Sequence, residues 1–386
     1  MTAAPAHARG AHRVLCFSAH SNNLRAAALV RCLSGLGYDV MRPRARGRAG
    51  GIGEMARSLI PHCWFALTRR ADLAVGFKPH LNVTLPLLIC RLRGMPTWID
   101  VDDIDHGYRE GWLARVIELS QRPFPRIFHI VTYHNPRLKD VLRTQMGCRD
   151  GRLLRIEQGV HYDFFNDPTL AARTDDLRRT LGIADRRVGI YTAHLNVACD
   201  LELVLTAWRA VASRLPDAVL LVVGGGPRLD PYRRLAREMG LEGAVRFTGQ
   251  VRHEQVPAYF ALAQSALLYF SARPVNVYRC SLKLREYFAS GVPVVCNDVG
   301  ELKDFAHLTY QSGSDLREFA ALAVRVLRGH SDGRERAARA HACEHLDWSR
   351  IVTVAEAEIA KRAGLKPGAP SRSTRPGAGK GELGPA

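Results

Sequence analysis

Short apolar runs alternate with amphipathic stretches along this chain. The first repeat consists of the apolar run at 13–19, a helical stretch from Asn23 to about Gly37 and a second short strand. Further apolar runs follow, with helical stretches between them, at 71–77, 96–101, 129–133 and 152–159. Strands that alternate with helices at this spacing predict a parallel sheet with helices on both faces.

Residues 160–186 are polar and helix-like and interrupt this rhythm. The alternation then restarts, with apolar runs at 188–193, 218–226, 244–249, 266–270 and 292–297. We therefore expect an α/β protein with two doubly wound domains in tandem. The predicted parts are a first domain at 1–165, a linker at 166–186, a second domain at 187–344, a helix at 345–364 and a disordered tail at 365–386, which is rich in Pro, Gly and Ser.

Lys and Arg outnumber Asp and Glu by 55 to 37, which gives a net charge of +18. An anionic neighbour would explain this balance, and so would the arginine usage of a GC-rich genome. The cluster RPRARGR at 42–48 is either a docking patch for phosphate or lipid head groups or a solvated loop. No apolar stretch approaches the roughly 20 residues that a membrane span needs, and no signal peptide is evident, so we expect a cytoplasmic location.

Nine cysteines are scattered along the chain without any C-x-x-C pair. They predict reduced thiols and indicate neither a disulfide framework nor a zinc site. The 15 histidines likewise show no spacing typical of a metal site, so we expect no bound metal.

The stretch SLKLREYFASGVPVV at 281–295 predicts a short helix running into a buried strand. Ser281 is a good N-cap, and Lys283 and Glu286 lie on one face of the helix. The helix N-terminus and Lys283 would attract phosphate, and Glu286 could accept hydrogen bonds from a pair of sugar hydroxyls. The alternative interpretation is a surface ion pair at i, i+3.

A second polar cluster, IDVDDIDHG at 99–107, follows a predicted strand. Asp100, Asp103 and His106 would lie at a carboxyl edge, where they could bind acceptor hydroxyls or steer a proton. An acidic turn that caps the next helix is the alternative. His20 and Asn22 follow the first strand at a similar edge.

KLREYFASGVPVV is similar to the donor-site signature of family 4 glycosyltransferases, which are retaining enzymes of the GT-B fold. Three further segments resemble that family in the right order, at 219–251, 156–165 and 346–351. The resemblance implies two Rossmann-like domains that face a cleft and a C-terminal helix that crosses back to the first domain. The D-V-D at 100–102 also matches the D-x-D metal motif of GT-A enzymes, which would require a single mixed-sheet domain instead.

The resemblance also implies roles for particular residues. Glu286 resembles the glutamate that holds the donor ribose, and Val251 would meet the nucleobase through its main chain. The groups expected beside the diphosphate are Lys283, Ser281, Arg279, His194 and the backbone of Leu282 and Leu284.

Three positions depart from the family pattern. Tyr278, His194 and Cys199 stand where the family commonly carries a glutamate, an arginine and a lysine. We expect Arg273, Arg279 or His194 to compensate, because arginine binds phosphate at least as well as lysine.

The resemblance implies a hexosyltransferase that moves a sugar from a nucleotide-sugar donor to a glycan or lipid-linked acceptor, with retention and without a metal. The first domain would hold the acceptor, with His20, Asn22 and His106 near it. Residues 42–48 could place the protein at the inner face of an anionic membrane, and no nucleic acid partner is expected. The alternatives are a sugar-nucleotide epimerase of the same fold and a catalytically degenerate basic protein that binds membranes or phosphate.

Overall fold

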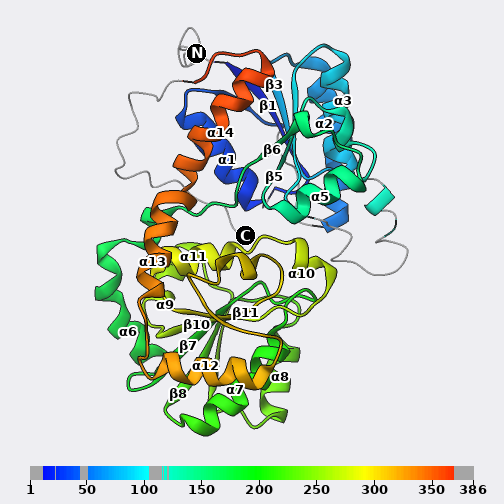
Figure 1. Cartoon of the computed structure of the whole chain (residues 1–386). Helices are drawn as coiled ribbons and strands as arrows, with labels where there is room; N and C mark the ends of the chain where they lie inside the picture. The colour runs from blue at the N-terminus through cyan, green and yellow to red at the C-terminus, as the bar shows by residue number, and fades with distance from the viewer. Residues whose placement is uncertain are drawn as a thin grey trace, which may run out of the picture. The chain divides into compact units, whose positions relative to one another are not determined.

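The computed structural model describes residues 12–21, 23–43, 51–103, 115, 117–119 and 121–368. The chain forms two compact units (Figure 1). The first unit comprises Met1–Glu157 together with Trp348–Ala386, and the second comprises Gln158–Asp347. Each unit is an α/β domain around a parallel sheet, as the alternation of the sequence predicts.

The sheet of the first unit has the order β2-β1-β3-β4-β5-β6, and all its described pairs are parallel. Its strands are β1 (Arg13–Ser18), β2 (Asp39–Met41), β3 (Leu73–Phe77), β4 (Thr97–Asp100), β5 (Ile130–Tyr133) and β6 (Leu153–Arg155). Every residue of β3, β4 and β5 is buried. Continuous burial of this kind is expected for parallel strands with helices on both faces.

The helices of the first unit connect these strands. They include α1 (Leu24–Gly35), α2 (Gly51–Thr68), α3 (Leu81–Leu92) and α5 (Pro136–Thr144). The Asn23 side chain caps α1 by accepting a hydrogen bond from the N–H of Ala26 at 2.9 Å. The sequence pattern did not predict α2, whose only Asp, Glu, Lys or Arg residues are Glu54 and Arg57.

The last described helix, α14 (Trp348–Ala363), belongs to the first unit. Trp348, Val352 and Ile359 lie in the same buried cluster as Leu29 of α1. The predicted helix that crosses back to the first domain is therefore confirmed. It begins three residues later than expected, because Asp347 is extended and separates it from a short π-helical turn at Ala342–Leu346.

The sheet of the second unit has the order β12-β11-β10-β7-β8-β9 and is also parallel. Its strands are β7 (Arg187–Thr192), β8 (Ala218–Val223), β9 (Val245–Gly249), β10 (Ser265–Leu268), β11 (Val294–Asn297) and β12 (Tyr310–Ser312). Gly189 lies in the middle of β7, where a Cβ atom would stand 2.8 Å from the ring of Trp208. The missing side chain lets this buried tryptophan pack directly on the strand.

The helices of the second unit are α6 (Ala171–Leu181), α7 (Leu201–Arg214), α8 (Leu229–Glu238), α9 (Val256–Phe260), α10 (Pro274–Tyr278), α11 (Leu282–Ser290), α12 (Leu316–Leu327) and α13 (Arg334–His341). Residues 166–186, where the sequence predicts a linker, contain α6. Arg178 of this helix donates to the carbonyl of Leu262 at 2.9 Å, so the segment is part of the second unit. Among the residues that the structure describes, no helix is long and apolar enough to cross a membrane.

Candidate functional site

Helix α11 begins at the carboxyl edge of the second sheet. The Ser281 Oγ accepts a hydrogen bond from the N–H of Leu284 at 3.4 Å, which confirms the predicted N-cap. Gly291 ends the helix with a left-handed φ of 70°. The Tyr287 hydroxyl ties the helix to the end of β7 by accepting a hydrogen bond from the N–H of Thr192 at 3.0 Å.

The first turn of α11 is partly occupied by the chain itself. The N–H of Ser281 donates to the buried carboxylate of Glu301, which pairs with Arg285 at 2.6 Å. The N–H of Leu284 is bonded to Ser281, and the Leu284 side chain is fully buried. The Leu284 N–H, which was expected beside the diphosphate, thus already has a partner within the chain. The N–H groups of Leu282 and Lys283 remain as those that could face an anion.

Lys283 is the cation of this helix tip. Its ammonium lies 4.8 Å from the centre of the Tyr191 ring, and its side chain is half-buried. Burial lowers the pKa of Lys283 to about 8, and the nearby Arg279 guanidinium acts in the same direction. An anionic ligand would stabilise the charged form of Lys283 strongly, because its attraction would offset part of the desolvation cost of the ammonium.

Glu286 is nine-tenths buried, and its partner is not Lys283. His253 Nε2 lies 3.1 Å from Glu286 Oε1, and the hydrogen bond to Glu286 raises the pKa of His253. The alternative interpretation, a surface ion pair between Lys283 and Glu286, is therefore wrong, because the described part of the chain pairs Glu286 with His253.

Sequence reasoning missed His253. It belongs to the short turn η6 (His253–Gln255), 33 residues before Glu286. Its ring stacks on Phe164 with a centroid distance of 5.1 Å and an interplanar angle of 9°. Phe164 is part of the segment at 156–165 that resembles the family, but no spacing in the sequence links it to His253.

The other cations of the site have different surroundings. Arg279 donates to Asn276 Oδ1 at 2.8 Å and lies over the Phe270 ring at 4.9 Å. Arg273 is paired with the buried carboxylate of Asp200 at 2.6 Å, so its charge is already balanced. His194 is exposed just after β7. Of the three expected substitutes for the missing family cations, Arg279 is thus the one whose charge acts directly on Lys283.

Cys199 occupies the position where the family commonly has a lysine. Its side chain is buried, and its Sγ lies 3.1 Å from the Tyr191 hydroxyl. Tyr191 therefore contacts both Lys283 and Cys199. A thiol in contact with the ring beside Lys283 thus stands where the family commonly has a second cation.

The glycine-rich turn after β8 packs its backbone closely against the segment that follows β7. Gly224 has a φ of 130°, and a Cβ atom there would lie 2.0 Å from the carbonyl oxygen of Ala193. A Cβ atom at Gly226, where φ is 145°, would lie 2.6 Å from the carbonyl oxygen of Leu195. The sequence GGGP at 224–227 is thus a tight turn in which Gly224 and Gly226 leave no room for a side chain. Val251, expected beside the nucleobase, is half-buried just after β9.

In the first unit, Asp100 is fully buried. Arg25 donates to both of its carboxylate oxygens, at 2.8 and 3.0 Å, and Thr132 donates to one of them at 2.5 Å. Arg25 also donates to the carbonyls of Ile156 and Glu157 and lies over the ring of Trp348. The expectation that Asp100 is catalytic is therefore wrong in this structure, because its carboxylate is enclosed in an ion pair.

The remaining predicted residues of the first unit lie at the carboxyl edge of its sheet or outside the described residues. Asp103 is half-buried after β4, and His20 Nδ1 lies 3.8 Å from Glu54 Oε2. Asn22 and His106 lie outside the described residues. The GT-A interpretation of D-V-D is wrong, because both units have parallel sheets and Asp100 is bound to Arg25. The described part of the chain contains no group of three or more His, Cys, Asp or Glu that could hold a metal ion.

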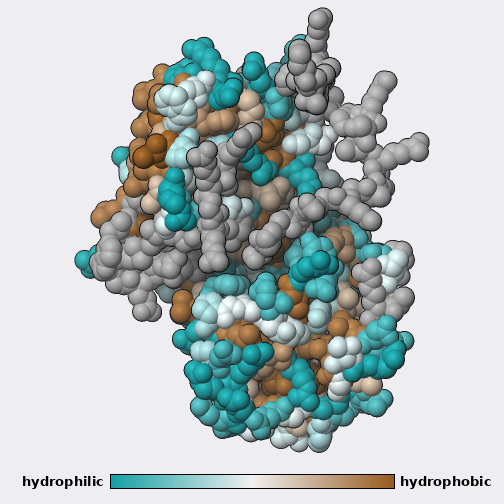
Figure 2. All heavy atoms as spheres, turned by 180° about the vertical axis from the view of Figure 1, so that it is seen from behind, coloured by the Kyte–Doolittle hydropathy of each residue, from teal (hydrophilic) through white to brown (hydrophobic). Residues whose placement is uncertain are grey.

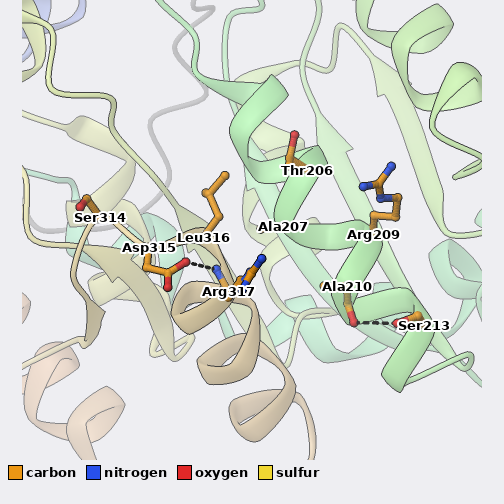
Figure 3. A pocket seen from close by; sticks show the side chains of 9 residues that line it. All are labelled: Thr206, Ala207, Arg209, Ala210, Ser213, Ser314, Asp315, Leu316 and Arg317. Atoms are coloured by element: carbon orange, nitrogen blue, oxygen red, sulfur yellow. Dashed lines mark hydrogen bonds between the residues drawn. The ribbon is translucent and has the colours of Figure 1, made fainter.

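A groove between α7 and α12 is separate from these residues (Figure 3). Arg209 of α7 and Arg317 of α12 contribute to its lining, and Asp315 accepts a hydrogen bond from the N–H of Arg317 at 2.7 Å. Lys283 and Glu286 are not among its lining residues. The groove therefore has no part in the candidate donor site.

Comparison with known proteins matches most of the second unit to a known family. A family model described as Glycosyl transferases group 1 matches residues 186–328. The GDP-mannose-dependent alpha-(1-6)-phosphatidylinositol monomannoside mannosyltransferase of Mycolicibacterium smegmatis is 28% identical over 199 residues, which are 50% of this chain and 51% of that protein. The alpha-D-kanosaminyltransferase of Streptomyces kanamyceticus is 26% identical over 267 residues, which are 66% of this chain and 67% of that protein. The matched region spans about half the length of the mannosyltransferases.

Solved structures extend the likeness to the whole fold. Alr3699/HepE of Anabaena, crystallised with UDP-glucose, superposes with a TM-score of 0.66 at 16% identity, covering 92% of this chain and 99% of that one. At this identity the likeness establishes the fold alone, which is GT-B.

Proposed function

Because residues 186–328 form a domain of the glycosyl transferases group 1 family, we propose that this protein is a retaining glycosyltransferase. It moves a hexose from a nucleotide-sugar donor to a glycan or a lipid-linked acceptor. The observation that carries the proposal is that one helix, α11, presents both a half-buried cation, Lys283, and a buried carboxylate, Glu286, at the carboxyl edge of the second sheet. Ligands of doubly wound sheets bind at such edges.

The roles of the residues follow from their chemistry. The sugar departs from a diphosphate whose negative charge grows in the transition state, and Lys283, Arg279 and the N–H groups of Leu282 and Lys283 would stabilise that charge. Glu286 would accept hydrogen bonds from the ribose hydroxyls, and the main chain of Val251 would meet the base. These cations take the part that a divalent metal plays in other glycosyltransferases, so we expect no metal requirement.

The acceptor is proposed from charge and from the relatives. One relative is named a phosphatidylinositol monomannoside mannosyltransferase and another an alpha-D-kanosaminyltransferase. The net charge of +18 and the arginines of 42–48, most of which lie outside the described residues, favour an acceptor at an anionic lipid surface. We therefore place a lipid-linked acceptor ahead of a soluble one.

A thermal-shift screen tests the donor site. UDP, GDP, ADP and TDP sugars are added to the wild type, to Glu286→Ala and to Glu242→Ala, a control on an exposed glutamate. One nucleotide sugar should raise the Tm of the wild type and of the control but not that of Glu286→Ala. The proposal fails if none raises the Tm, or if Glu286→Ala responds like the wild type. Product analysis separates transfer from epimerisation, because an epimerase releases an altered donor without an acceptor.

A further inference from the structure

Helix α2 exposes a row of large apolar side chains. Ile60, Trp64 and Leu67 are 79%, 66% and 54% exposed. Their spacing of i, i+4 and i+7 puts them on one face of the helix. The opposite face is buried, since the rings of His62 and Phe65 contact Phe17 of β1 at centroid distances of 5.7 and 6.3 Å. The exposed face is therefore not needed for the core of the first unit.

Neighbouring residues extend this surface. Helix α3, which packs beside α2, exposes Leu92 at its end by 78%. Figure 2 shows hydrophobic atoms on the surface of the first unit over the region of these two helices. Soluble proteins seldom gather so many exposed large apolar side chains unless the surface meets a partner or a membrane.

The charged side chains that α2 and the two residues after Thr68 expose are arginines. Arg57, Arg69 and Arg70 are exposed at the start and the end of the apolar row. Glu54, the helix's one acidic residue, accepts a hydrogen bond from the N–H of Ser21 at 2.8 Å and is only 13% exposed. Within residues 51–70 the sequence has three arginines against this one glutamate. An anionic surface would therefore meet little repulsion here.

We propose that α2 docks on a lipid surface with anionic head groups, with Ile60, Trp64 and Leu67 entering the boundary between head groups and acyl chains. The arrangement has the features of an interfacial helix, namely an apolar face, a tryptophan at the water boundary and flanking arginines. Each arginine near such a surface adds to the attraction. A protein partner would not require the bias toward positive charge.

The inference rests on the proposed function for its purpose, because docking would bring the first unit to a lipid-linked acceptor. It can nevertheless be measured without any transfer reaction. Failure to bind vesicles would contradict the docking of α2 but not the proposed donor site. Failure of the donor screen would contradict the donor site but not the docking of α2.

The test is flotation of the full chain with vesicles of phosphatidylcholine alone and with vesicles that contain about 30% phosphatidylglycerol. The variants are Ile60→Ser/Trp64→Ser/Leu67→Ser and Arg69→Ser/Arg70→Ser. The matched controls are Val354→Ser, a residue of α14 that is 78% exposed, and Arg209→Ser/Arg317→Ser, which removes two exposed arginines from the second unit.

We expect the wild type and both controls to bind the anionic vesicles and to bind phosphatidylcholine alone weakly. The apolar triple variant should lose about tenfold or more in vesicle affinity, and the arginine variant should lose affinity most at low salt. Donor-induced Tm shifts should be unchanged in all four. Equal binding of the triple variant and the wild type would overturn the proposal. A wild type that binds neither kind of vesicle would also overturn it. If that wild type self-associates in sedimentation velocity and the triple variant does not, the apolar face is an interface between copies of this chain instead.

Discussion

His253 and Glu286 are joined by a hydrogen bond of 3.1 Å between Nε2 and Oε1 that links the turn η6 to helix α11. The His253 ring is stacked on Phe164, so the orientation of one oxygen of Glu286 is determined by two segments distant in sequence. The other oxygen remains for the proposed ribose contact. The pair thus connects the packing of the second unit with its proposed donor chemistry.

The His253–Glu286 pair predicts a pH-dependent contribution to stability. Because the pKa of His253 is raised above its unfolded value of about 6.5, the contribution is complete below that value and disappears as the pH rises through the raised pKa. The difference in Tm between the wild type and His253→Gln should therefore be larger near pH 6 than near about pH 9. Thermal unfolding across this range measures it. A difference that is constant with pH would show that only the stacking on Phe164 matters.

Lys283→Met should separate stability from catalysis. Removal of a half-buried charge whose pKa is lowered to about 8 should leave the Tm of the free protein unchanged or raise it. In contrast, kcat should fall about a hundredfold to a thousandfold, because the departing diphosphate would lose the cation that we propose stabilises it. Lys283→Arg is the control that keeps the charge. A Met variant with normal kcat would remove Lys283 from the proposed mechanism.

The same lysine predicts how donor use depends on pH. Its ammonium is present below a pKa of about 8 and is lost above it in the free protein. The value of kcat/KM for the donor should therefore decline above about pH 8. Initial rates at low donor concentration measure this decline. It should be absent in Lys283→Arg, whose guanidinium keeps its proton.

The buried Arg25–Asp100 pair predicts a large loss of stability when it is broken. Arg25→Met leaves a buried carboxylate without its partner and should cost about 3–5 kcal/mol of the free energy of unfolding. Arg187→Met, which breaks an exposed pair with Asp217, should cost less than about 1 kcal/mol. Urea unfolding compares the two. If Asp100→Asn keeps its stability and loses only activity, the carboxylate acts in catalysis after all.

The glycine turn predicts a steric effect. Gly224→Ala would bring a methyl group into contact with the carbonyl of Ala193 at a φ of 130°, so it should destabilise the second unit by about 1–3 kcal/mol or more. Gly243→Ala, where no heavy atom lies within 4 Å, is the matched control. Denaturant midpoints measure both. Equal midpoints would contradict the close packing of the turn.

The order of the elements was well predicted, because apolar runs of five to nine residues followed by amphipathic stretches have few solutions other than β-α units. Boundaries were less accurate, as at 166–186, where a polar helix resembles a linker until its packing on α9 is seen. Helix α2 was missed altogether. Its exposed side includes Ile60, Trp64 and Leu67, so the usual contrast between an apolar and a polar face is weak.

For the candidate site, too, local relations could be predicted from the sequence, and contacts between distant segments could not. The sequence by itself determined the short-range relations, namely the N-cap at Ser281 and the shared face of Lys283 and Glu286, because these depend only on helical spacing. Tertiary structure alone decided which partner each charge has. Glu286 pairs with His253 instead of Lys283, Arg273 is held by Asp200, and Asp100 is enclosed with Arg25. Such pairings join segments that are distant along the chain, and local sequence patterns carry no information about those distances.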